Sequence, residues 1–106
     1  MLIEAQKELL DTTVDVTVHD WLEGLDECLA TGEIEQANIC NDRAVALQTA
    51  SLLMREGKNV TDEMYYEVMH SVGAAIADNL THKMCPGMAE KFAGLFNALR
   101  FIYCKA

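Results

Sequence analysis

The sequence holds two short pairs of side chains of the types that bind metal ions. Glu67 and His70 stand three residues apart, and a helix places residues at this spacing on one face. Carboxylate-bridged metal bundles need two such pairs and two further glutamates, whereas this chain has one pair. We therefore expect Glu67 and His70 to form a solvated pair or a pair at the edge of the core. A metal-binding helical protein is an alternative function.

The second pair, His82 and Cys85, supplies an imidazole and a thiol, which is half of a zinc-ligand set. Cys40, Cys104 or His19 would have to complete the set, and their spacing does not indicate that they do. Cys85 precedes an expected helix, where the dipole favours a thiolate, but this alone does not make a catalytic couple with His82. The sequence also lacks a glycine-rich phosphate loop and a GxSxG motif. We predict a protein that is not an enzyme, with no catalytic residues, no metal ligands and no cofactor.

Charge is distributed unevenly along the chain. The net charge is −9, but residues 1–42 hold eleven acids and a single base, Lys7, while residues 43–106 hold six acids and seven bases. A protein that binds nucleic acid directly needs a positive surface, so we expect no direct contact with nucleic acid. An acidic surface instead suits a basic protein partner, or simply favours solubility.

A helix over residues 3–15 would place four of the acids in a row on one face. A row of carboxylates can resemble a phosphate backbone, and such a row could occupy a nucleic-acid-binding protein. We predict that this row and a second acidic cluster bind a protein partner. The predicted residues are Glu4, Glu8, Asp11, Asp15, Glu23, Asp26 and Glu27. A solvated outer face without a partner is the alternative.

Helices must position these side chains, and the clearest helix is expected over residues 61–80. Thr61 can cap its first turn, and the acids that follow suit the helix dipole. Tyr66, beside the stripe, is a candidate for an exposed contact surface. The apolar stripe of this helix consists of Tyr65, Val68, Met69, Val72, Ile76 and Leu80.

The segment from residue 2 to residue 31 is helical at both ends and ambiguous between them. Residues 12–18 are rich in threonine and valine, which favour a strand, but no second strand exists to pair with them. We expect a break here, with Thr17 capping a new helix, because threonine and valine have poor helix propensity. The alternative is one continuous helix. Trp21 is expected in the core, and Gly32 is expected to end the helix.

Two more helices are expected, one before and one after the helix over residues 61–80. Residues 33–56 form the first, which ends at Gly57 and could be interrupted near Asn38 or Asn41. Residues 81–85 are expected to form a loop. Pro86 would then occupy the first position of the last helix, where its missing N–H costs nothing.

Together these segments predict an all-α fold, a single-domain bundle of four or five mostly antiparallel helices over residues 1–106. Its core would come from the stripes at residues 18–29, 44–54, 65–80 and 88–103. No run of about 18 apolar residues could cross a membrane, and the N-terminus does not resemble a signal peptide. We therefore expect a cytoplasmic protein without membrane contact. Its four cysteines would be reduced and mostly fill the core: Cys28, Cys40, Cys85 and Cys104.

The absence of a catalytic set and the acidic first part of the chain favour one function. We expect a small acidic interaction protein, a regulator or inhibitor that binds a macromolecular partner, and this partner could be a nucleic-acid-binding protein or complex. The alternatives are a metal-binding protein, using Glu67 and His70 or His82 and Cys85, and a self-assembling structural subunit. A homodimer would add buried surface to a chain of this small size.

Overall fold

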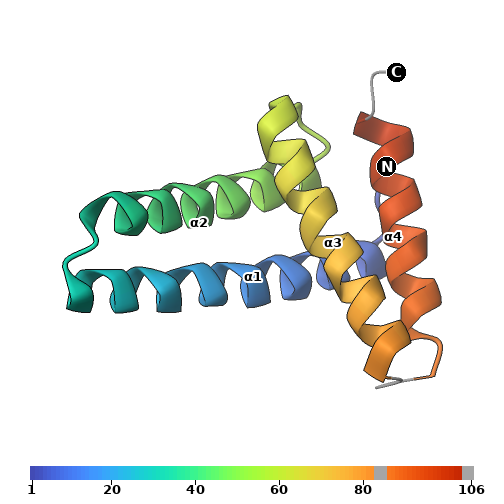
Figure 1. The fold of residues 1–106 in the computed structure, drawn as a ribbon. Helices are drawn as coiled ribbons and strands as arrows, with labels where there is room; N and C mark the ends of the chain where they lie inside the picture. The colour runs from blue at the N-terminus through green and yellow to red at the C-terminus, as the bar shows by residue number, and fades with distance from the viewer. Residues whose placement is uncertain (83–85, 104–106) are drawn as a thin grey trace.

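The computed structural model describes residues 1–82 and 86–103, and these residues form four α-helices and no strand. The all-α prediction is confirmed, and four helices fit the expected number. None of the described helices combines the length and the apolar character needed to cross a membrane. The helices are α1 (Glu4–Thr31), α2 (Ile34–Arg55), α3 (Asp62–His82) and α4 (Met88–Tyr103) (Figure 1).

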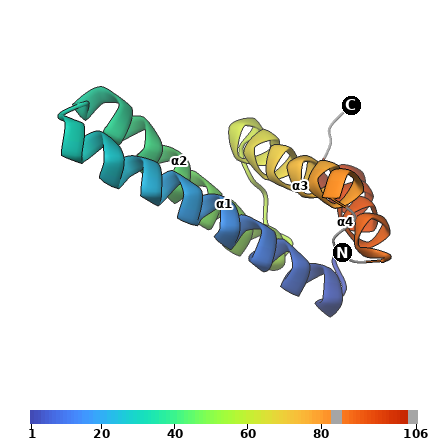
Figure 2. The ribbon, with the colours of Figure 1, turned by 60° about the horizontal axis from the view of Figure 1, so that its bottom comes forward.

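The helices form two hairpins that cross each other. α1 and α2 lie side by side and run in opposite directions, while α3 and α4 pair and pack across one end of that first hairpin (Figure 1). A turned view shows the two hairpins as two layers (Figure 2). The other end of the α1–α2 hairpin projects beyond α3 and α4. We call this projecting part, residues 22–42, the arm.

The core lies where the two hairpins cross. Its largest fully buried side chains come from all four helices and are Leu10, Val14, Leu47, Met54, Val68, Val72, Leu95 and Leu99. Within the arm only Ala37 and Cys40 are buried. A Cβ added at Gly24 would lie 3.4 Å from Cys40 Sγ, so the two helices of the arm approach each other closely through small residues.

α1 is one continuous helix, so the expected break at Thr17 is wrong. Leu10, Val14 and Val18 are all buried, and an uninterrupted helix brings the three of them to the same core. The hydroxyls of Thr13 and Thr17 each donate to a backbone carbonyl one turn earlier, at 2.7 and 3.3 Å. They bond within the helix instead of capping a new one. Burial of the valines therefore outweighs the poor helix propensity of the segment.

The expected core stripe over residues 18–29 is only partly correct. Val18 is buried, but Leu22 and Leu29 are exposed, because α1 continues past α3 and α4 and has only α2 to pack against. Trp21 is half-buried at the edge of the core. Leu80, at the far end of the α3 stripe, is also exposed.

Three predicted helix ends agree with the structure. Gly32 has a left-handed backbone with φ 78°, and its N–H donates to the Leu29 carbonyl at 3.3 Å. α2 continues through Asn38 and Asn41 and ends just before Gly57, which has φ 70°. At the start of α3, Thr61 Oγ1 accepts a hydrogen bond from the Met64 N–H at 3.2 Å.

The last helix begins two residues later than expected. Pro86 and Gly87 form a turn, and α4 starts at Met88. Gly87 has φ 80°, a value outside the helical range, so the helix can begin only after it. Thr81 and His82, expected in a loop, are the last residues of α3, and residues 83–85 lie outside the described part of the chain.

Candidate functional site

The continuous α1 helix positions the predicted acidic row. Glu4, Glu8 and Asp15 are exposed to solvent. Glu4 pairs with Lys7 at 3.4 Å, whereas no ion pair to Glu8 or Asp15 is found among the described residues. Three members of the row are therefore accessible to a partner.

Asp11 differs from the rest of the row because it is half-buried between α1 and α2. Its Oδ2 lies 2.7 Å from Arg55 Nη1, and its Oδ1 accepts a hydrogen bond from Ser51 Oγ at 3.1 Å. Both partners belong to α2, so Asp11 holds the two helices of the hairpin together.

The second acidic cluster lies on the arm. Glu23, Asp26 and Glu27 are all exposed. Glu23 Oε1 lies 3.0 Å from His19 Nε2, one turn away. Asp26 follows Asp15 by eleven residues, which is about three helical turns, so it continues the same line on the surface of α1. The continuous helix thus joins the two acidic clusters, which the expected break would have separated.

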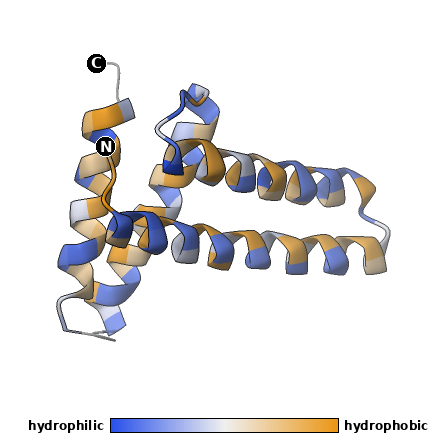
Figure 3. Cartoon of the chain, turned by 180° about the vertical axis from the view of Figure 1, so that it is seen from behind, coloured by the Kyte–Doolittle hydropathy of each residue, from blue (hydrophilic) through white to orange (hydrophobic). Residues whose placement is uncertain are grey.

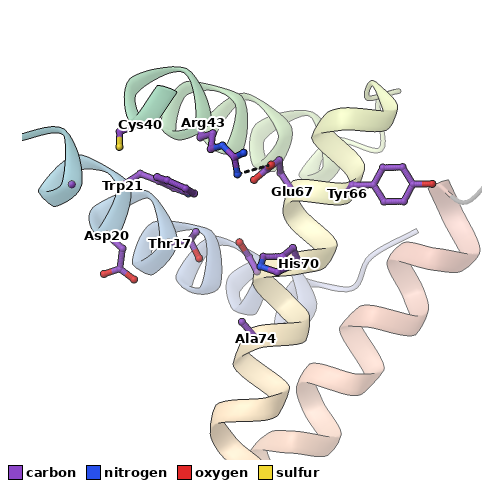
Figure 4. A pocket seen from close by; sticks show the side chains of 11 residues that line it. Thr17, Asp20, Trp21, Cys40, Arg43, Tyr66, Glu67, His70 and Ala74 are labelled. Atoms are coloured by element: carbon purple, nitrogen blue, oxygen red, sulfur yellow. Dashed lines mark hydrogen bonds and ion pairs between the residues drawn. The ribbon is translucent and has the colours of Figure 1, made fainter. Parts of the chain in front are cut away.

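A cleft of about 750 Å³ lies between the α1–α2 hairpin and α3. The sequence did not predict it. Its walls include Asp20 and Trp21 from α1, Arg43 from α2, and Glu67 and His70 from α3 (Figure 4).

Arg43 is the central side chain of the cleft. Its Cζ lies 5.0 Å from the centroid of the Trp21 ring, and its Nη1 lies 3.4 Å from Glu67 Oε1 (Figure 4). The guanidinium therefore contacts α1 and α3 as well as its own helix. Arg43 was missed because only folding brings it to Trp21. The one sequence signal was that it is the sole Lys or Arg between Lys7 and Arg55.

The two predicted metal-type pairs have different surroundings. The Glu67 carboxylate is paired with Arg43, while His70 is exposed at the mouth of the cleft. Within residues 1–82 and 86–103, no three His, Cys, Asp or Glu side chains gather as a metal site would require. His82 is exposed at the end of α3, and its partner Cys85 lies outside the described residues, as does Cys104.

The two cysteines of the arm are free thiols. Cys40 is buried on α2, and Cys28 is half-buried on α1. Partial burial raises the pKa of the Cys28 thiol, and the neighbouring Cys40 and Glu33 raise it further. A raised pKa disfavours the reactive thiolate, so Cys28 has the properties of a packing residue.

Tyr66 is exposed, as the sequence predicted, with 69% of its surface accessible. Its ring makes an edge-to-face contact with Tyr65, with centroids 5.4 Å apart. In Figure 4 the Tyr66 side chain points away from Arg43 and Trp21, so it lies at the rim of the cleft.

Comparison with known proteins found no matching family model, no matching curated protein and no matching solved structure.

Proposed function

We propose that this chain is a non-enzymatic interaction protein, a regulator or inhibitor that binds a basic macromolecular partner through the acidic surface of α1. One observation supports the proposal above the others. Because α1 is continuous, Glu8, Asp15 and Asp26 share one exposed line that extends over five helical turns. A nucleic-acid-binding protein, whose site is basic, is the partner that this line suits best.

The acidic side chains of this line have no lysine or arginine in their own part of the chain, which favours a basic partner as the source of opposite charge. Residues 8–42 contain no Lys or Arg, and the only cationic group that can form there is protonated His19. Lys91 of α4 lines a groove with Glu8, and Arg55 of α2 lines a hollow with Asp15, but among the described residues neither forms an ion pair with these two carboxylates. A basic partner would lower the mutual repulsion of the acids on this line. Such charges accelerate association and set its dependence on salt.

The test reverses two exposed charges on the line and leaves the structural Asp11 in place. We expect Asp15→Lys with Asp26→Lys to reduce capture of the partner from an extract of the source organism at least tenfold at low salt. A duplex DNA competitor should release the partner from the unchanged protein, since both would occupy the same basic surface.

The matched control changes two other exposed aspartates in helix interiors, Asp42→Lys and Asp78→Lys. It alters the net charge by the same amount, and circular dichroism checks that both variants keep their helices. Equal loss of capture in the two variants would mean that net charge alone matters. Unchanged capture by the Asp15 and Asp26 variant would refute the assignment to α1.

A further inference from the structure

The α1–α2 hairpin has an uncovered side, which we call the outer face. At the end of the hairpin near the core, this side forms a hollow lined by residues of α1 and α2 alone. The residues of the hollow are Asp11, Val14, Asp15, Gln48, Ser51, Leu52 and Arg55. α3 lies on the opposite side of the hairpin, where its residues line the cleft together with Thr17 and Trp21.

Helical periodicity extends the outer face from this hollow to the tip of the arm. On α1, Leu22 and Leu29 follow Asp15 at intervals of seven residues, so they lie on the same side of the helix. On α2, Val45 precedes Leu52 by seven residues, and Ile34 precedes Val45 by eleven. Both intervals are close to whole numbers of turns. The outer face therefore carries aliphatic side chains on both helices.

These aliphatic side chains are open to solvent. The exposed fractions of Leu22, Leu29, Ile34, Val45 and Leu52 lie between 39% and 65%. Hydrophobic segments recur along both helices out to the turn when the molecule is viewed from behind (Figure 3). Several exposed aliphatics in line, bordered by polar residues, are typical of a binding surface.

The charged side chains near the exposed aliphatic residues of the outer face indicate what kind of partner covers them. On α1, the acids Glu8, Asp15 and Asp26 share one side of the helix with Leu22 and Leu29, while on α2 the neutral Asn41 and Gln48 lie beside the aliphatic side chains. A second copy of the chain has no Lys or Arg in residues 8–42 to offer to these carboxylates, and its Arg55 is paired with Asp11. A second copy would instead bring another strongly acidic hairpin. The occupant that fits is apolar on one side and basic along one flank.

We propose that the outer face of the hairpin binds a basic amphipathic helix of a partner protein. This inference rests on the proposed function and adds the binding mode. Residues seven apart, such as Leu22 and Leu29, lie about 10 Å apart along the helix axis. The same interval recurs on the apolar side of a partner helix, which would lie between α1 and α2 as a third helix. Its lysines or arginines would meet Glu8, Asp15 and Asp26.

The test uses the full chain and three synthetic peptides of 18 residues, with binding measured by fluorescence anisotropy. One peptide is an amphipathic helix of leucine and lysine, the second has the same composition in scrambled order, and the third has glutamate in place of lysine. We expect the first peptide to bind at least tenfold more tightly than either of the others.

Variants locate the bound peptide. Leu22→Gln, Leu29→Gln and Val45→Gln together remove apolar contacts and keep every charge, so they should weaken binding of the amphipathic peptide at least tenfold. The matched control, Ile39→Gln with Leu80→Gln and Phe101→Gln, changes three exposed apolar residues away from the outer face and should bind as the unchanged chain does.

The remaining outcomes separate this inference from the proposed function. Equal binding of the amphipathic and scrambled peptides, with no effect of the three glutamines, would overturn the helix site and leave a purely electrostatic surface on α1. A dimer in sedimentation analysis that the same three glutamines dissociate would overturn it in favour of a second copy. Loss of the helix site together with unchanged partner capture by the Asp15 and Asp26 variant would refute both proposals.

Discussion

At the scale of single residues, the acidic side chains of α1 divide into two kinds. Asp11 is held by Arg55 and Ser51 inside the hairpin, whereas Asp15, one turn later, is exposed. The sequence assigns both to one row, because spacing along a helix shows which residues share a face. Spacing cannot show which of them a second helix will cover.

This difference predicts effects of unequal size for two similar substitutions. Asp11→Ala removes an ion pair and a hydrogen bond to a charged group, so it should lower the free energy of unfolding by about 1 kcal/mol. Asp15→Ala, on the same helix, should change it by less than about 0.5 kcal/mol. Urea unfolding followed by circular dichroism measures both. A loss for Asp15→Ala as large as for Asp11→Ala would contradict the distinction.

At the scale of helices and turns, local sequence signals predicted where a helix ends better than they predicted whether a helix is continuous. The cap by Thr61 and the left-handed Gly32 were correctly predicted, because both depend on neighbouring residues in the chain. The continuity of α1 depends on contacts with the other helices, so the local helix propensity around Thr17 predicted a break that does not exist. The contact of Arg43 with Trp21 was missed for the same reason, since it joins residues on different helices.

Two glycines test the role of the backbone in these elements. Gly32 has φ 78° and no atom within 4 Å of an added Cβ, so Gly32→Ala should cost about 1 kcal/mol from backbone strain alone. Gly73 is equally free of neighbours but lies inside α3, where alanine is the better helix former. Gly73→Ala should therefore stabilise the protein by up to about 1 kcal/mol. Thermal unfolding of the two variants should shift in opposite directions, and a shift in the same direction would contradict this account.

At the scale of the whole molecule, the stabilising contacts are concentrated at one end. The core unites all four helices where the hairpins cross, and the arm has only Ala37 and Cys40 buried. The sequence predicted the all-α class, and the four described helices fit the predicted four or five. It could not predict that the two hairpins cross, because their relative orientation is set by which apolar faces meet.

This unequal distribution of contacts predicts unequal local stability. Backbone amides within residues 26–40 should exchange with solvent through openings that need about 2 kcal/mol less free energy than those of Val68 to Val72. Hydrogen exchange under native conditions, followed by mass spectrometry, measures the difference. Equal protection in the two regions would show that the arm opens only when the whole molecule unfolds.

The separation of the core from the arm has an evolutionary consequence. Few of the residues that hold the fold together belong to the surface proposed to recognise a partner, and most residues of that surface are already in contact with water. Substitutions at Leu22, Asp26 or Leu29 would therefore change recognition with little change in the free energy of unfolding. A chain built in this way can acquire a new partner by changing its arm, while selection on Leu10, Leu47 and Leu95 preserves its architecture.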